Sequence, residues 1–135
     1  MSDLYFDPLA AIDPSDPDLF RSAKRMAKAI VDSPDDDEND YWTFQSRRLL
    51  ASAIVHVMTD PAYSEENQDL RSLQALMDSS DTREALFRSM AENQACDGRV
   101  AACGQYMVDA GNSAPKLYWS VAQQAMHSLK EHIDE

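Results

Sequence analysis

The stretch DYWTFQSRRLLASAIVHVMT, residues 40–59, decides the fold. Its apolar side chains occur on nearly every side of a helix rather than along one stripe. They are Tyr41, Trp42, Phe44, Leu49, Leu50, Ala53, Ile54, Val55, Val57 and Met58. A helix that is apolar all round usually lies in the middle of a domain, with neighbours on several sides. We therefore expect a central helix over residues 40–59, ended by Asp60-Pro61.

Helical spacing of apolar residues predicts one helix before this segment and four after it. The first spans about residues 17–31, with Ser15 or Asp16 as its cap and Pro17 in its first turn. Its buried stripe consists of Phe20, Ala23, Ala27, Ile30 and Val31.

Four helices are expected after the central one. A short helix carries Leu70, Leu73, Leu76 and Met77. The next begins at Ser80 or Asp81, and Glu84 suggests a capping box there. A fifth spans about residues 98–110 and stops at Gly111. The last starts at Asn112 or Ser113, with Pro115 in its first turn, and runs to the end of the chain.

The predicted fold class is therefore all-α, a compact bundle of about six helices. Residues 1–15 form an extended lead-in, because Asp7-Pro8 and Asp13-Pro14 disfavour helix there, and residues 16–135 form one helical domain. Only three glycines occur in 135 residues, which fits helices better than tight hairpins. Cys96 and Cys103 are expected to be reduced, with Cys103 buried.

Catalytic signatures are missing from the sequence. It contains neither GxxxxGK[ST] nor GxGxxG nor GxSxG, and His56, His127 and His132 do not have the spacing of metal ligands. We predict that the domain is no enzyme, and we assign no catalytic residue, cofactor or metal. The start of the chain lacks the pattern of a signal peptide, and the longest nearly apolar run, residues 49–58, is too short to span a membrane. We expect a cytoplasmic domain without membrane contact.

The chain has a net charge of −12, and five of its 24 acidic residues form one dense acidic segment, residues 35–40. Its carboxylates are Asp35, Asp36, Asp37, Glu38 and Asp40. Such a segment can attract and bind a basic peptide, or it can be a solvated linker that keeps the domain in solution. Both interpretations remain open from the residues alone.

A basic ridge opposes this acidity on the first helix. Arg21, Lys24, Arg25 and Lys28 follow the i, i+3, i+4, i+7 spacing that places them on one face. Such a ridge can bind a phosphate backbone. We favour a solvated helix face, because the negative charge of the chain as a whole repels nucleic acid.

The first half of the chain resembles a known family. The lead-in Phe6-Asp7-Pro8-Leu9, the helix beginning Asp18-Leu19-Phe20, and Tyr41-Trp42 followed by Arg47-Arg48-Leu49-Leu50 carry the resemblance. Together they resemble the all-α domain of type IV secretion coupling proteins, the TraD/TraG-like conjugative DNA-transfer ATPases.

The resemblance implies a place and a role for the domain. It would be an insertion in a RecA-like ATPase that is anchored to the bacterial inner membrane, and it would recognise the transfer substrate. Its partners would be the rest of the coupling ATPase and segments of relaxase, effectors or their adaptors. The charge of the chain, rather than any matched residue, suggests that basic segments such as secretion signals would bind the acidic segment. DNA binding through the basic ridge, and a purely structural insertion that supports motor assembly, are the alternatives.

Overall fold

Six α-helices make up the part of the chain that the structure, a computed structural model, describes: residues 13, 15–31, 41–63 and 68–134. No strand occurs among these residues. The helices are α1 (Leu19–Ile30), α2 (Tyr41–Thr59), α3 (Leu70–Asp78), α4 (Ser80–Ala91), α5 (Ala95–Ser113) and α6 (Pro115–Asp134). The all-α class and the helix order predicted from the sequence are confirmed.

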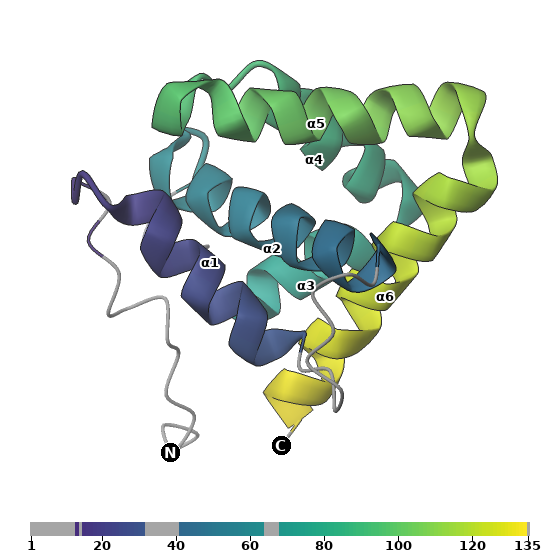
Figure 1. Ribbon diagram of the computed structural model, residues 1–135, viewed down its shortest axis with the longest axis horizontal. Helices are drawn as coiled ribbons and strands as arrows, with labels where there is room; N and C mark the ends of the chain where they lie inside the picture. The colour runs from purple at the N-terminus through teal and green to yellow at the C-terminus, as the bar shows by residue number, and fades with distance from the viewer. Residues whose placement is uncertain (1–12, 14, 32–40, 64–67, 135) are drawn as a thin grey trace.

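Helix α2 lies in the middle of this arrangement (Figure 1). It packs against α1 on one side and against α5 and α6 on others, with smaller contacts to α3 and α4. All nine residues from Leu49 to Val57 are buried. Because neighbours cover every side of this segment, the prediction of a central helix is confirmed for its second half.

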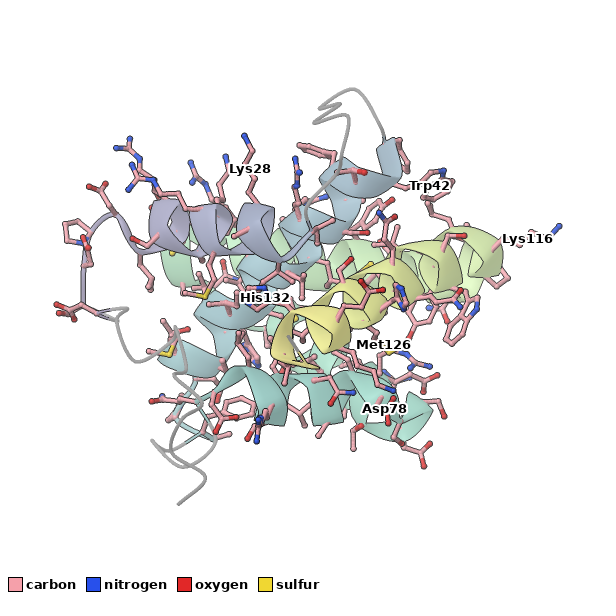
Figure 2. All side chains as sticks on the ribbon, turned by 90° about the horizontal axis from the view of Figure 1, so that it is seen from below. Lys28, Trp42, Asp78, Lys116, Met126 and His132 are labelled. Atoms are coloured by element: carbon pink, nitrogen blue, oxygen red, sulfur yellow. The ribbon has the colours of Figure 1, made fainter. Side chains whose placement is uncertain are left out.

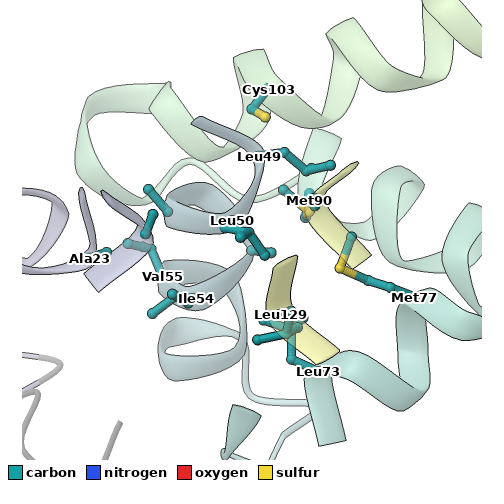
Figure 3. Close-up of a cluster of buried hydrophobic side chains, with 14 of the residues drawn as sticks. Ala23, Leu49, Leu50, Ile54, Val55, Leu73, Met77, Met90, Cys103 and Leu129 are labelled. Atoms are coloured by element: carbon teal, nitrogen blue, oxygen red, sulfur yellow. The ribbon is translucent and has the colours of Figure 1, made fainter. Parts of the chain in front are cut away.

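The core forms where the other helices turn their apolar stripes towards α2 (Figure 3). Ala23 of α1, Leu73 and Met77 of α3, Met90 of α4, Cys103 of α5 and Leu129 of α6 all gather around Leu49, Leu50 and Ile54. Full burial of one such Leu, Ile or Met side chain stabilises the fold by roughly 1.5–3 kcal/mol. The free Cys103 is buried, as expected, and Cys96 is also unpaired.

Two predictions about the start of α1 are wrong. The helix begins at Leu19 after Asp18, with no side-chain cap, and Pro17 lies in the preceding turn. The Asp16 carboxylate accepts the Asp18 N–H at 2.8 Å, which closes a local turn instead of capping the helix. Leu19 is buried in this first turn, whereas Phe20 is only partly buried.

The corner between α3 and α4 is held differently from the predicted capping box. Ser79 precedes α4, and its side chain makes no capping bond. The Thr82 hydroxyl donates to Leu76 O at 2.6 Å, and the buried Arg83 guanidinium donates to Met77 O at 2.8 Å. Side chains of α4 therefore satisfy the last carbonyls of α3, where helix ends otherwise leave acceptors unpaired.

The ends of α5 also differ from the prediction. Three residues near its start, Cys96, Asp97 and Gly98, have φ of 55°, 60° and 81° and form a left-handed turn, so the regular helix starts after Gly98. Gly111 does not end the helix, which continues to Ser113 and stops at Ala114, because a residue before proline avoids helical geometry.

Gly104 is required where α5 crosses the end of α4. A Cβ at this position would lie 2.7 Å from Met90 C and would also clash with the backbone nitrogen of Ala91. By contrast, a Cβ at Gly111 would meet only the Tyr118 ring, at 3.4 Å or more. The two helices can approach this closely only because residue 104 has no side chain.

We expect Gly104→Ala to lower the free energy of unfolding by about 1–3 kcal/mol, because backbone atoms cannot move aside as a side chain can. Gly111→Ala is the matched control and should raise it by roughly 0.5–1 kcal/mol, since alanine favours a helix interior. Urea unfolding of both variants measures the difference. Equal stability of the Gly104→Ala variant and the original chain would contradict the close approach.

Candidate interaction surfaces

Charge is unevenly distributed along the chain. All 12 lysine and arginine residues lie in the described part, with 13 of the 24 acidic residues, so this part has a formal net charge of −1 against −12 for the whole chain. Six of the 12 cations lie on α1 and α2, and neither helix contains an aspartate or glutamate. The acidity of the protein is therefore not a property of its helical body. The acidic segment itself, residues 35–40, falls outside the described residues.

The basic ridge lies on the solvent side of α1. Arg21, Lys24, Arg25 and Lys28 are all exposed, and Lys28 projects away from the bundle in Figure 2. The opposite side of α1 carries the buried Leu19, Ala23, Ala27 and Ile30. The four cations thus form a row about two turns long, as their spacing predicted.

Two further arginines adjoin the ends of α1. Arg47 Nε donates to Val31 O at 2.8 Å. Arg47, one of the residues that carry the family resemblance, therefore binds a carbonyl just past the end of α1. The Arg99 guanidinium lies 5.1 Å from the ring centre of Phe20 at the start of α1. Positive charge at a helix C-terminus is favourable, so Arg47 stabilises the position of α1 on α2.

An aromatic cluster joins the start of α2 to the facing turn of α5; its members are Tyr41, Trp42 and Tyr106, and Phe44 is a further exposed ring in the first turns of α2. Tyr41, Trp42 and Phe44 are 46%, 41% and 55% exposed, although the sequence suggested buried positions. The rings of Tyr41 and Trp42 meet edge to face at 5.1 Å. The expectation that α2 is covered on all sides is therefore wrong for these three exposed side chains, although Thr43 and Gln45 beside them are buried.

Contacts within the aromatic cluster hold two of its members in place. The Tyr41 and Tyr106 hydroxyls are hydrogen-bonded to each other. The Arg48 guanidinium lies over the Tyr106 ring, 5.4 Å from its centre, and donates to Gln45 Oε1. Burial, and then the bond to Tyr41, raise the pKa of Tyr106 to about 12. The cluster is thus an ordered surface of exposed rings with an arginine beside it.

Because the folded state favours the neutral phenol, Tyr106 contributes stability that is present below its ordinary pKa of 10.0 and is lost as the pH rises through about 12. We expect Tyr41→Phe to lower the pKa of Tyr106, because it removes the hydroxyl that favours the neutral form. Tyrosinate absorbance in an alkaline titration measures this. Tyr118→Phe is the control, and an unchanged Tyr106 pKa in Tyr41→Phe would refute the bond.

A buried polar cluster lies where the end of α2 meets the end of α4. His56 is 0% exposed, and its Nε2 lies 3.1 Å from Ser89 Oγ and 3.6 Å from Asp60 Oδ2. The Ser89 hydroxyl donates to Asp60 at 3.4 Å. Spacing alone places Asp60 one turn after His56, but it could not predict that Ser89 of α4 meets them here.

The hydrogen bonds determine which nitrogen of His56 carries the proton. Asn93 Oδ1 accepts the Ala95 N–H, so its amide NH₂ points to His56 Nδ1, at 3.0 Å, and to Thr59 Oγ1. Nδ1 must therefore accept, and the proton lies on Nε2, facing Ser89. A histidine in this state cannot take the serine proton, so the trio lacks the geometry of a serine hydrolase.

A shallow pocket of about 270 Å³ lies between α4, α5 and α6. Its lining combines Phe87, Met107 and Tyr118 with the polar Glu84 and Arg88. Among the described residues no group of three or more His, Cys, Asp or Glu could hold a metal ion. None of the described helices is long and apolar enough to cross a membrane.

Comparison with known proteins adds no family to these observations. No protein-family model matches the chain, and neither does any curated protein or solved structure. Function must therefore be inferred from the surfaces themselves.

Proposed function

We propose that this chain is the substrate-recognition domain of a type IV secretion coupling protein and that it binds basic segments of transferred proteins or their adaptors. The ATP chemistry would belong to a motor outside these residues, into which the domain would be inserted. In this proposal the domain works in the cytoplasm, while its parent protein is anchored to the inner membrane.

The observation that supports binding is the exposed aromatic cluster. Tryptophan, tyrosine and arginine are the residues that most often dominate protein–protein binding energy. Here Tyr41, Trp42 and Phe44 remain 41–55% exposed on a helix whose later residues are completely buried. Three large rings exposed within the first turns of one helix leave unused the stabilisation that their burial would give, which is typical of a binding surface.

The position of the cluster in the sequence suggests the chemistry of the ligand. Tyr41 directly follows the acidic segment, residues 35–40, so carboxylates and exposed rings are joined by the chain itself. A basic segment with an apolar or aromatic anchor could use both. Lysine and arginine side chains would pair with the carboxylates and stack on the rings.

We expect the double variant Trp42→Ala/Phe44→Ala to weaken binding of a basic secretion-signal peptide by about 30-fold or more, the effect of losing one hot spot. Trp119→Ala is the matched control, because Trp119 is 45% exposed but lies on α6 beside Arg83. Isothermal titration measures both. Equal losses in the two variants, or no loss in the double variant, would refute the role of the cluster.

The acidic segment is tested separately in the same titration. Neutralising Asp35, Asp36 and Asp37 to asparagine should weaken binding and reduce its dependence on salt, since exposed charges are screened within about 10 Å at 0.1 M. An affinity that ignores salt in the original chain, or survives the triple change, would remove the segment from the proposal.

A second candidate function, DNA binding, is favoured by the exposure of the basic ridge. Four cations in one row could follow a phosphate backbone, and the nearly neutral body around them repels DNA less than the total charge suggests.

We expect Lys24→Glu/Arg25→Glu to abolish DNA binding at low salt if the ridge binds DNA, because electrostatics are strongest there. Lys116→Glu/Lys130→Glu on α6 is a control of equal charge change at two exposed positions. Fluorescence anisotropy with single-stranded and duplex DNA distinguishes them. Absence of binding by the original chain at low salt would eliminate this function.

A further inference from the structure

Asn93 connects the short link between α4 and α5 to the end of α2. Its NH₂ group donates to His56 Nδ1 and to Thr59 Oγ1, each at 3.0 Å, while its carbonyl accepts the Ala95 N–H at 3.0 Å. Thr59 in turn donates to Val55 O at 2.8 Å, so its oxygen is left as an acceptor for Asn93. Asn93 therefore fixes the link to α2 through two hydrogen bonds, and a third binds it to the start of α5.

The segment that follows this link is under backbone strain. Cys96 and Asp97 have positive φ, a conformation that costs non-glycine residues of order 1–3 kcal/mol and persists only where its surroundings enforce it. Gly98 N–H closes the turn on Gln94 O at 3.0 Å. Asn93 lies directly before this turn, so its three bonds hold the end from which the strained conformation begins.

Burial and neighbouring groups determine how His56 responds to acid. Asp60 is the charged group that faces its ring, 3.6 Å from Nε2, and the Tyr63 ring meets it edge to face at 5.5 Å. Ser89 of α4 and Asn93 of the link contribute only neutral groups. Burial lowers the pKa of His56 more than the Asp60 carboxylate raises it. At neutral pH the ring is therefore uncharged, with Nδ1 free to accept from Asn93.

We propose that His56 and Asn93 form a proton-operated latch on the α4–α5 link. A proton added to Nδ1 turns the acceptor into a donor that faces the donor NH₂ of Asn93. The Asn93–His56 bond is then lost and the two groups repel each other, while Nε2 keeps its bonds to Ser89 and Asp60. Asn93 then keeps only Thr59 as its partner on α2, so the link is held more weakly and the left-handed turn can relax.

The pH range of the latch follows from the sign of the shift. A histidine whose pKa is lowered by folding contributes stability that is present above its ordinary pKa of 6.5 and is lost as the pH falls through the folded pKa. The latch is thus closed at neutral pH and opens as the pH falls through the folded pKa of His56, which lies below 6.5. It does not depend on the proposed function, because it needs only the contacts of His56 and Asn93.

Hydrogen exchange of the full chain tests the latch. Amide exchange is measured at about pH 7 and about pH 5, the range in which histidine switches act, and corrected for the intrinsic effect of pH. We expect exchange at residues 95–98 to rise about tenfold or more in acid relative to buried amides of α2, the effect of losing one buried hydrogen bond. The side-chain NMR signal of His56 should titrate over the same range.

Asn93→Ser provides the decisive variant, because it removes the latch without touching the histidine. In this variant the amides of residues 95–98 should exchange fast at both pH values, so that acid no longer increases their exchange rate. His127→Gln, on the exposed side of α6, is the control and should keep the rise. Three results would overturn the proposal. Residues 95–98 could exchange equally fast at both pH values although His56 titrates, or they could open together with the buried amides of α2. The third is an Asn93→Ser variant in which acid still increases exchange at residues 95–98 in full.

Discussion

The need to bury α2 on every side determines the rest of the structure. Residues 49–57 form a continuous buried stretch, and no single partner helix can cover more than one side of it. Helices α1, α5 and α6 each cover a part, and α3 and α4 complete the layer behind. The remaining helices therefore need only one apolar stripe each, and their outer faces are left for charge and binding.

The sequence predicted the helices well because their apolar periodicity is a local property. It predicted their ends less well, because those depend on contacts that have no local pattern. Arg83 binding Met77 O takes the place of a capping box at the start of α4, and the residue before Pro115, rather than Gly111, ends α5. In both cases tertiary or steric constraints override the usual capping preference.

The candidate surfaces were predictable only in part. The basic ridge followed from spacing alone, since a row of cations beside an apolar stripe must face water. The exposure of the aromatic rings did not follow from the sequence, because Trp42 and Phe44 are as apolar as true core residues, and only the structure shows that they remain 41% and 55% exposed. The buried contacts of His56 likewise join residues that are more than 30 positions apart in the chain.

The close approach at Gly104 also determines how the two ends of α5 could move relative to α4. The contact with the end of α4 acts as a pivot in the middle of a stiff rod, about 8 Å from Arg99 and about 14 Å from Ser113 at the rise of a helix. A rotation of α5 about this contact would therefore move its end at Ser113, where α5 meets α6, farther than its end at Arg99.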